Sequence, residues 1–401
     1  MSPRVLVIAA VLGLPGCYVG FDGEPTTGSS GAASSGGGPA GEGEAPTSAG
    51  PGGTPGTSDM SVGTAGETGG GPGTDGPGTD GPGTTDAATG EPVTTGPMTT
   101  GPATTGPMTT DPVTTEPMTT DPGTSTGEPP PDEVAQLCQR WNGDRAQLGE
   151  GMWSGDAASC NKGAVSQDGR DNALRLVNLY RWIADLPPVA EDAGKTGSAQ
   201  ACALMMHANG ALSHTPPANW KCYTADGAGA AGKSNISGGA GVFSVDLYMI
   251  DVGNETTMGH RRWILSNSLG PIGLGSTSQY SCLYVIGGGG NAGKPWLAWP
   301  PPGLVPLQAM HVETVGWSDV DQAGWSVQSD GIDLGAATVA VKSGGVDLPV
   351  TVNALGANYG SSSAVRFVPK GWQVEAGKTY DVTLGNVGQA IAYSVTIVDC
   401  G

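Results

Sequence analysis

Residues 171–188, DNALRLVNLYRWIADLPP, are the most regular stretch of the chain and predict its first long helix. Polar side chains recur there every three or four positions, so they lie on one stripe of an α-helix; they are Asp171, Arg175, Asn178, Arg181 and Asp185. The charges at 171 and 175, and those at 181 and 185, are placed to form ion pairs one turn apart. Pro187 and Pro188 end the helix because proline lacks an amide hydrogen and disfavours helix in its predecessor.

Shorter patterns continue to residue 300. A second helix is predicted from Ser198, as its N-cap, to about Gly210. A glycine-rich stretch follows at 227–241. Further short elements are then predicted, namely helices at 245–251 and 260–265 and strands at 272–275 and 280–286. We treat residues 131–300 as one domain.

The run Pro300-Pro301-Pro302-Gly303 marks a change of pattern. Beyond it, short alternating apolar runs are separated by Gly, Asn and Asp, as turns require. These runs lie at 339–341, 348–352, 365–368, 380–384 and 393–397. Several short strands at this spacing predict a small β-sandwich, similar to an immunoglobulin domain, over residues 303–401.

Residues 1–17 have the features of an export signal. Arg4 precedes an apolar run from Val5 to Leu14, which is too short to span a bilayer. Leu14-Pro15-Gly16-Cys17 then resembles a bacterial lipobox, whose cysteine is lipidated after cleavage. We expect an exported protein that is lipid-anchored at the cell envelope through Cys17. Because Tyr18 is not the aspartate that retains lipoproteins at an inner membrane, we expect the outer membrane or cell surface. The alternative is ordinary signal cleavage that discards Cys17.

Residues 18–130 are predicted to be a disordered tether. They are dominated by Gly, Pro, Thr and Ser, and have almost no large apolar side chains to offset the entropy of folding. A five-residue repeat such as Gly96-Pro97-Met98-Thr99-Thr100 keeps the segment extended. Acids recur without Lys or Arg, and contribute much of the net charge of −20. We expect no nucleic-acid binding, because no basic stripe is present to neutralise phosphates.

Six cysteines follow Cys17, and none lies in a Cys-x-x-Cys pair. An even number in an exported protein predicts three disulfides. Fifteen connectivities are open to six cysteines. Proximity in the sequence favours Cys138–Cys160 and Cys202–Cys222, which leaves Cys282–Cys400.

Two of the four histidines stand in distinctive settings. His214 follows the second predicted helix in ALSHTPP, and His260 lies in GHRRWIL. Histidine binds metals, transfers protons and anchors polar ligands near neutral pH. A purely structural role, with each ring bonded to nearby oxygens, is an equal alternative for this pair. His207 and His311 are interpreted as structural.

These motifs together resemble the CAP superfamily, which includes cysteine-rich secretory proteins, insect antigen 5, plant pathogenesis-related proteins and many bacterial secreted forms. The bacterial members have an N-x-x-R helix, an "lsH" helix end, a "GENI" turn and a "gHR.nIL" segment. These correspond here to residues 178–181, 212–214, 232–236 and 259–265. The resemblance covers about residues 165–290. It implies an α/β fold, an α-β-α sandwich with a central cleft; the C-terminal β-sandwich lies outside it.

In the family the cleft holds two histidines and two acids, and the chain departs from that pattern. His214 and His260 match the histidines, but Lys233 and Ser234 stand where the glutamate of the "GENI" turn is expected. Asp251, three residues after Tyr248, is the candidate for the second acid, and Asp246 competes with it. We therefore assign His214, His260, Asp251, Ser234 and Asn235 to the binding cleft.

Loss of the glutamate weakens both metal binding and catalysis. Zinc at His214 and His260 is the one cofactor to consider, and stable zinc sites usually take three or four protein ligands. No Gly-x-Ser-x-Gly elbow and no His-Glu-x-x-His motif occurs. We favour a monomeric, non-enzymatic surface protein that binds a lipid, a glycan or another surface protein. The competing hypotheses are a metal-assisted hydrolase of peptide or envelope polymer, and a passive structural lipoprotein with a vestigial cleft.

Overall fold

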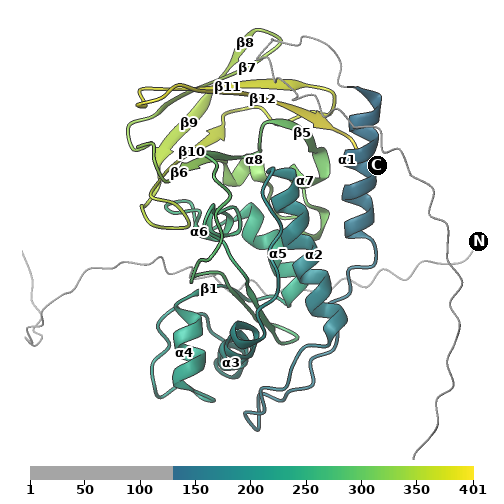
Figure 1. Ribbon diagram of the computed structural model, residues 1–401, viewed down its shortest axis with the longest axis vertical. Coiled ribbons are helices and arrows are strands. Elements are labelled where there is room, and N and C mark those ends of the chain that lie inside the picture. Colours follow the sequence, from purple (N-terminus) through teal and green to yellow (C-terminus); the bar gives the residue numbers. More distant parts are fainter. Residues whose placement is uncertain (1–129) are drawn as a thin grey trace, which may run out of the picture. The chain divides into compact units, whose positions relative to one another are not determined.

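The computed structural model describes residues 130–401 (Figure 1). The predicted signal peptide, the lipidated Cys17 and the tether fall on residues 1–129, outside the described part of the chain, and stay predictions.

A three-stranded antiparallel sheet lies at the centre of the first half of the fold. Its order is β1 (Ser234–Ser237), β3 (Ser281–Tyr284) and β2 (Gly273–Ser276). Successive side chains of a strand point to opposite faces. Cys282 is bonded to Cys202 on α3, whereas its neighbour Ser281 contacts Tyr248 on α5, so helices cover both faces. The predicted α-β-α sandwich is thereby confirmed.

The helices of this half are α1 (Pro131–Arg145), α2 (Gln167–Ile183), α3 (Ala193–Asn209), α4 (Ala225–Ala231), α5 (Gly241–Ile250) and α6 (Gly259–Ile264). α2 is the helix that the periodicity predicted, and begins four residues earlier. α3 begins before the predicted Ser198. Its N-cap is Asp192, whose Oδ1 accepts a hydrogen bond from the Lys195 amide at 2.9 Å, and Gly210 ends it with a left-handed φ of 58°.

The polar stripe predicted for α2 is wrong at Arg181. This residue is fully buried, and its guanidinium donates to the carbonyl oxygens of Pro187 and Ile264 at 2.9 and 2.7 Å. Asp185 pairs instead with Lys294. Arg175 donates to the side chain of Asn172 instead of Asp171. Neither of the two predicted ion pairs, 171–175 and 181–185, therefore forms. The periodicity identified the polar positions, but a long guanidinium side chain can be buried wherever carbonyl oxygens satisfy it.

The C-terminal half contains two sheets, as predicted for a β-sandwich. One has the order β4 (Leu297–Trp299), β6 (Trp325–Ser329), β10 (Ser363–Pro369) and β9 (Val350–Ala354). The other has the order β5 (Gly303–Pro306), β12 (Ile391–Val398), β11 (Thr379–Gly385), β7 (Thr338–Ser343) and β8 (Val346–Leu348). Short helices α7 (Leu307–Met310), η1 (Glu313–Val315) and α8 (Val320–Ala323) lie between β5 and β6.

The two halves share one continuous hydrophobic core. It contains Leu176 and Val245 of the α-β-α layers together with Trp299, Val327 and Val395 of the C-terminal sheets. β4, which precedes the predicted boundary at Pro300, pairs with β6 of the C-terminal region. Figure 1 shows α1 beside the C-terminal sheets as well as beside α2. The C-terminal region is therefore packed against the helical layers through a common interior.

The described cysteines form three disulfides, as predicted, but the pairing expected from proximity is wrong. The bonds join Cys138 to Cys400, Cys160 to Cys222 and Cys202 to Cys282. Folding brings α1 to the end of β12 and α3 to β3, so separations of 262 and 80 residues are closed in space. The separation of two cysteines along the chain therefore does not predict which of them are paired.

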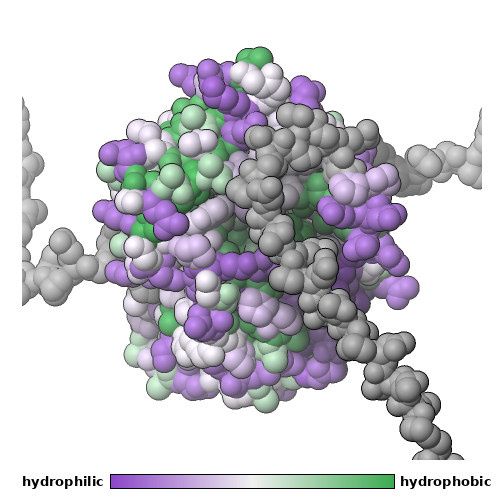
Figure 2. Space-filling view, turned by 45° about the horizontal axis from the view of Figure 1, so that its top comes forward, coloured by the Kyte–Doolittle hydropathy of each residue, from purple (hydrophilic) through white to green (hydrophobic). Residues whose placement is uncertain are grey.

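Within residues 130–401, no helix has both the length and the apolar composition needed to cross a bilayer. Figure 2 shows hydrophilic and hydrophobic residues interspersed over the described part of one face, instead of gathered into a single apolar patch.

The other two histidines lie in packed surroundings. The His207 ring lies between those of Trp153 and Tyr280, at centroid distances of 5.3 and 5.8 Å. His311 lies between two carboxylates, with Nδ1 3.4 Å from Asp319 Oδ2 and Nε2 3.7 Å from Asp321 Oδ2. The interaction with Asp321 is the main cause that raises the pKa of His311 above its usual value, and burial opposes it.

Candidate functional site

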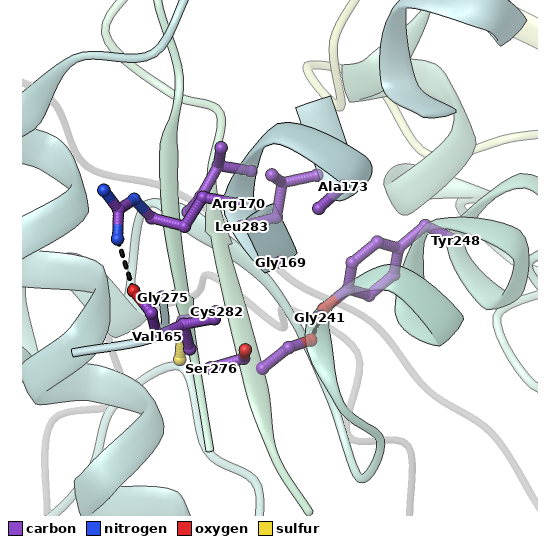
Figure 3. A pocket seen from close by; sticks show the side chains of 12 residues that line it. Val165, Gly169, Arg170, Ala173, Gly241, Tyr248, Gly275, Ser276, Cys282 and Leu283 are labelled. Atoms are coloured by element: carbon purple, nitrogen blue, oxygen red, sulfur yellow. Dashed lines mark hydrogen bonds between the residues drawn. The ribbon is translucent and has the colours of Figure 1, made fainter. Parts of the chain in front are cut away.

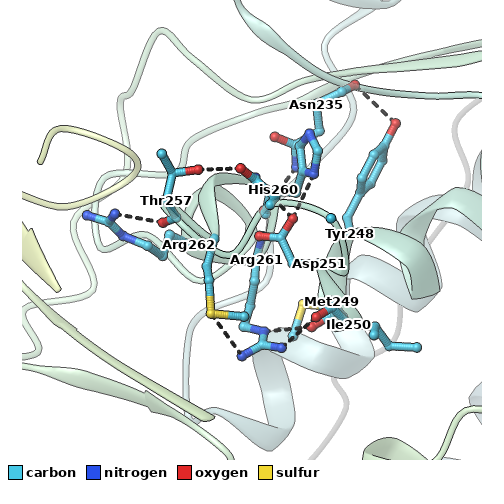
Figure 4. A network of polar contacts seen from close by, with 12 residues as sticks. Asn235, Tyr248, Met249, Ile250, Asp251, Thr257, His260, Arg261 and Arg262 are labelled. Carbon is cyan, nitrogen blue, oxygen red and sulfur yellow. Dashed lines mark hydrogen bonds and ion pairs between the residues drawn. The ribbon is translucent and has the colours of Figure 1, made fainter. Parts of the chain in front are cut away.

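His260 and Asp251 form a buried polar contact in the predicted cleft (Figure 4). His260 is in the first turn of α6, and Asp251 ends α5 in the left-handed conformation, with φ 61°. The imidazole Nδ1 lies 2.8 Å from Asp251 Oδ1, and both residues are buried. A carboxylate oxygen only accepts, so Nδ1 carries the proton and the lone pair of the neutral ring is on Nε2.

The same carboxylate joins His260 to the residue that follows it. Asp251 Oδ2 accepts the backbone N–H of Arg261 at 3.2 Å, and Oδ1 also accepts from the Asn254 amide at 3.2 Å. Asp251 therefore orients the imidazole and the first turn of α6 together. Such a partner on the far nitrogen is what sets the tautomer and direction of a functional histidine.

Asn235 and Tyr248 hold the other side of His260. The Asn235 side-chain amide donates to the His260 carbonyl at 3.0 Å, and the Tyr248 hydroxyl donates to the Asn235 carbonyl at 3.1 Å. The Tyr248 ring lies against the imidazole, with centroids 5.1 Å apart. The hydroxyl of Ser281 on β3 is 2.7 Å from the Tyr248 oxygen. One buried network thus connects α5, α6, β1 and β3 at this histidine.

His214 lies on the turn after α3, against the end of α4. Its Nδ1 is 2.9 Å from the Ala231 carbonyl, so this nitrogen carries the proton in His214 as well. Burial is the main cause that lowers the pKa of His214, the hydrogen bond to Ala231 opposes it, and the electrostatic effect of His260 lowers the pKa further. His214 is therefore neutral at neutral pH.

The remaining predicted residues are distributed differently. Ser234 is buried and donates its hydroxyl to the Ala230 carbonyl at 2.8 Å, which ties β1 to α4. Lys233 holds its ammonium 6.0 Å from the ring centroid of Tyr284. Asp246, the competitor of Asp251, is bound by both guanidinium nitrogens of Arg145 at 2.9 and 2.8 Å, away from the histidines. Of the two acids considered, Asp251 is the one that contacts a cleft histidine.

The sequence interpretation missed how strongly the C-terminal half supports this site. Arg261 is fully buried, and its guanidinium donates to the carbonyl oxygens of Met249, Ile250 and Gly324 at 2.6, 2.8 and 2.7 Å. Burial lowers the pKa of Arg261 to about 9, and the nearby charge of Asp251 opposes this effect. Arg261 therefore remains charged at neutral pH while it joins α5 and α6 to the start of β6.

Arg262 makes a second connection to the C-terminal half. It donates to the Gly356 carbonyl at 2.6 Å and to the Ser361 carbonyl at 3.1 Å, both in the loop between β9 and β10. A Cβ on Gly259 would lie 2.8 Å from Cδ1 of Tyr359 in that loop. The only signal in the sequence was the pair of arginines directly after His260, since the loop lies outside the motifs that identified the cleft.

Comparison with protein families gives an independent observation. The model of the cysteine-rich secretory protein family, CAP, matches residues 174–287. Residues 174–287 form a CAP domain. This range contains the central sheet and both cleft histidines. No curated protein and no solved structure shows a significant similarity to the chain.

The CAP domain also contains a small hollow on the α2–α5 side of its sheet (Figure 3). It measures about 300 Å³, counting space open to solvent. Its wall includes apolar side chains of Ala173, Leu274 and Leu283. Tyr248 and Ser281 also line it, so the hydroxyl pair beside His260 borders this hollow as well. The motifs gave no indication of it.

The donors of the predicted cleft do not fit a tight zinc site. Among residues 130–401 no group of three or more His, Cys, Asp and Glu side chains is arranged to hold a metal ion. Both Nδ1 atoms are occupied, and Asp251 binds the protonated side of His260. Catalytic zinc sites use three protein ligands and structural sites use four. We therefore derive no step of the function through a metal.

Proposed function

We propose that this protein is a non-enzymatic, extracellular binding protein whose CAP cleft recognises a hydroxyl-rich ligand, with a glycan as the favoured class. The single observation that carries the proposal is the orientation of the two imidazoles. Each uses its Nδ1 proton internally, His260 on Asp251 and His214 on Ala231. These contacts fix the direction of both imidazoles, and ring nitrogens exchange hydrogen bonds with hydroxyl groups in either protonation state.

The neutral state of His214 favours an uncharged partner. A lowered pKa keeps this imidazole from becoming cationic at neutral pH, so it offers an acceptor instead of an ion pair. A lipid or another surface protein remains the competing ligand class. Three disulfides and the CAP domain fit an extracellular protein, and we propose the lipid on Cys17 as its anchor at the outer membrane or cell surface.

A hydrolase is the second candidate, because a buried Asp–His pair like Asp251–His260 is a suitable general base. A nucleophile is missing from the assigned residues. Ser234 donates to Ala230, and Ser213 accepts the Thr215 amide at 3.1 Å in its own turn. Binding therefore accounts for more of the site than hydrolysis does.

The proposal is tested with the exported chain on an array of neutral and acidic oligosaccharides. We expect binding by the wild type and by the His311→Gln variant, and a loss of about tenfold or more in His214→Ala and His260→Ala. Thermal unfolding of each variant controls for folding. Wild-type protein that binds no oligosaccharide, or binding that survives both cleft substitutions, would refute the glycan proposal.

The same preparations separate the alternatives. Turnover of a fluorogenic peptide or of purified envelope polymer that requires His260 and Asp251 would favour the hydrolase. Metal analysis is expected to find less than one equivalent of zinc, and a stoichiometric, His-dependent zinc content would overturn the metal-free interpretation. Cys17→Ala is expected to release the protein from membranes, and continued membrane association would contradict the lipid anchor.

A further inference from the structure

Two lysines of the CAP domain hold their ammonium groups over one aromatic ring. Lys195 Nζ is 5.5 Å from the ring centroid of Tyr284, and Lys233 Nζ is 6.0 Å from it. Lys195 comes from the first turn of α3, and Lys233 from the residue before β1. Cations are attracted to the face of an aromatic ring, but two of them near one ring repel each other.

Carboxylates do not neutralise this lysine pair. Within residues 130–401 the lysine ion pairs are those of Lys294, Lys342 and Lys378. The acids beside Lys195 are used elsewhere: Glu191 is paired with Arg170, and Asp192 caps α3. Lys162, Lys221 and Lys370 also lack an ion pair in this part of the chain, so what distinguishes Lys195 and Lys233 is the aromatic ring that they share.

The backbone around the pair is fixed, and one side of it lacks side chains. The Lys233 carbonyl accepts the amides of Val285 and Ile286, both at 3.0 Å, which holds the end of β3 beside Lys233. Lys195 Nζ donates to the Pro271 carbonyl at 2.6 Å. A Cβ on Gly287 would lie 3.6 Å from Lys195 Nζ, so glycine leaves this side of the ammonium uncovered. Gly287 is exposed, so a ligand can approach from solvent.

From this arrangement we propose that Lys195, Lys233 and Tyr284 form a binding site for an oxoanion of the phosphate or sulfate type. The anion supplies a counter-charge to the two ammonium groups, while the N-terminal end of α3 adds a favourable dipole. In an envelope protein this chemistry occurs on phosphorylated glycans and on phospholipid headgroups. The site uses other side chains than the two cleft histidines and goes beyond the proposed glycan binding.

The test uses the full exported chain and two probes at low ionic strength. Inorganic phosphate is titrated while NMR follows the lysine side chains and the Tyr284 ring. Vesicles of phosphatidylcholine, with and without phosphatidylglycerol, are tested by flotation after removal of the N-terminal lipid with the Cys17→Ala variant. Binding is expected to weaken as salt is added, because exposed charges are screened.

We expect phosphate to shift the signals of all three residues, and each of Lys195→Gln and Lys233→Gln to weaken binding about tenfold. Lys370→Gln, a lysine of the C-terminal half, is the matched control and should not change it. Vesicle binding that requires both lysines assigns the anion to a headgroup, and phosphate binding without vesicle binding assigns it to a soluble or glycan-borne phosphate. Lys195→Gln should leave oligosaccharide binding unchanged, which separates this site from the cleft.

Two results would overturn the proposal. One is the absence of any phosphate-dependent shift at Tyr284 together with an absence of lysine-dependent vesicle binding. The other is an equal loss of binding in Lys370→Gln, which would show that general surface charge accounts for the affinity. Unchanged thermal unfolding of the lysine variants confirms that any loss is not due to misfolding.

Discussion

Replacing Arg261 by methionine tests whether the C-terminal half holds the cleft segment in place. The guanidinium donates to three backbone carbonyls, those of Met249, Ile250 and Gly324, and is fully buried. Methionine retains the length and packing of the side chain but offers no donor. Each carbonyl left unsatisfied costs about 1–3 kcal/mol, and relief of the buried charge offsets part of that sum. We expect the free energy of unfolding to fall by about 3–5 kcal/mol, a large fraction of the total for a typical domain.

Chemical denaturation at pH 7, followed by tryptophan fluorescence, measures this change. Arg261→Lys is the matched variant, because it keeps the charge but replaces a planar fork by a single ammonium. We expect its free energy of unfolding to lie between those of the wild type and Arg261→Met. A loss below about 1 kcal/mol in Arg261→Met, with an unchanged denaturant slope, would refute the role assigned to the three carbonyl contacts.

Three further predictions concern the packing around the site. Removing the Cys138–Cys400 disulfide by a double Ala substitution is expected to lower stability by about 2–5 kcal/mol, because the bond closes a separation of 262 residues; an unchanged denaturation midpoint would contradict this. The fold raises the pKa of His311, so the protonated imidazole contributes its full amount to the free energy of unfolding below about pH 6.5, and this stability is lost as the pH rises through the higher folded-state pKa. His311→Gln should therefore remove the decline in urea midpoints between pH 6 and 9. A decline that is unchanged in the variant would show that other groups cause it. Gly360→Ala is expected to lower the free energy of unfolding by about 2 kcal/mol or more, since φ is +70° and the new Cβ would lie 2.4 Å from the Arg262 carbonyl oxygen. Gly371→Ala is the control for backbone strain, because φ is +77° there and no atom lies near the new Cβ. Equal losses in the two variants would exclude the contact with the Arg262 carbonyl as the cause.

Local patterns were sufficient where the physical cause was local. The spacing of polar residues predicted α2, and alternation predicted strands such as β11 and β12, because both reflect which side of one element faces the core. The order of the short motifs identified the CAP domain. Each of these features depends on residues that are close together in the chain.

Tertiary partners could not be predicted in the same way. Nothing near Arg181 indicates that carbonyls around residue 264 will satisfy it. The partner of Cys138 is 262 residues away. The preference for Asp251 over Asp246 rested on a family spacing. In the structure, Asp251 ends α5 beside His260, whereas Asp246 lies within α5 and is bound by Arg145 of α1. Contacts between residues far apart in the chain determine these partners, and no periodic pattern in the sequence indicates them.

The bond between Cys138 and Cys400 also determines how mechanical force would enter the protein. Residues 1–129 precede α1, so a pull from that side reaches Cys138 after the first seven residues that follow Pro131. From there a covalent bond transfers the load to Cys400, two residues beyond the end of β12. β12 is hydrogen-bonded to neighbours on both sides, β5 and β11, so the load is distributed as shear over two ladders. The load on Cys138 is therefore divided between the rest of α1 and the C-terminal sheet, instead of falling on α1 alone.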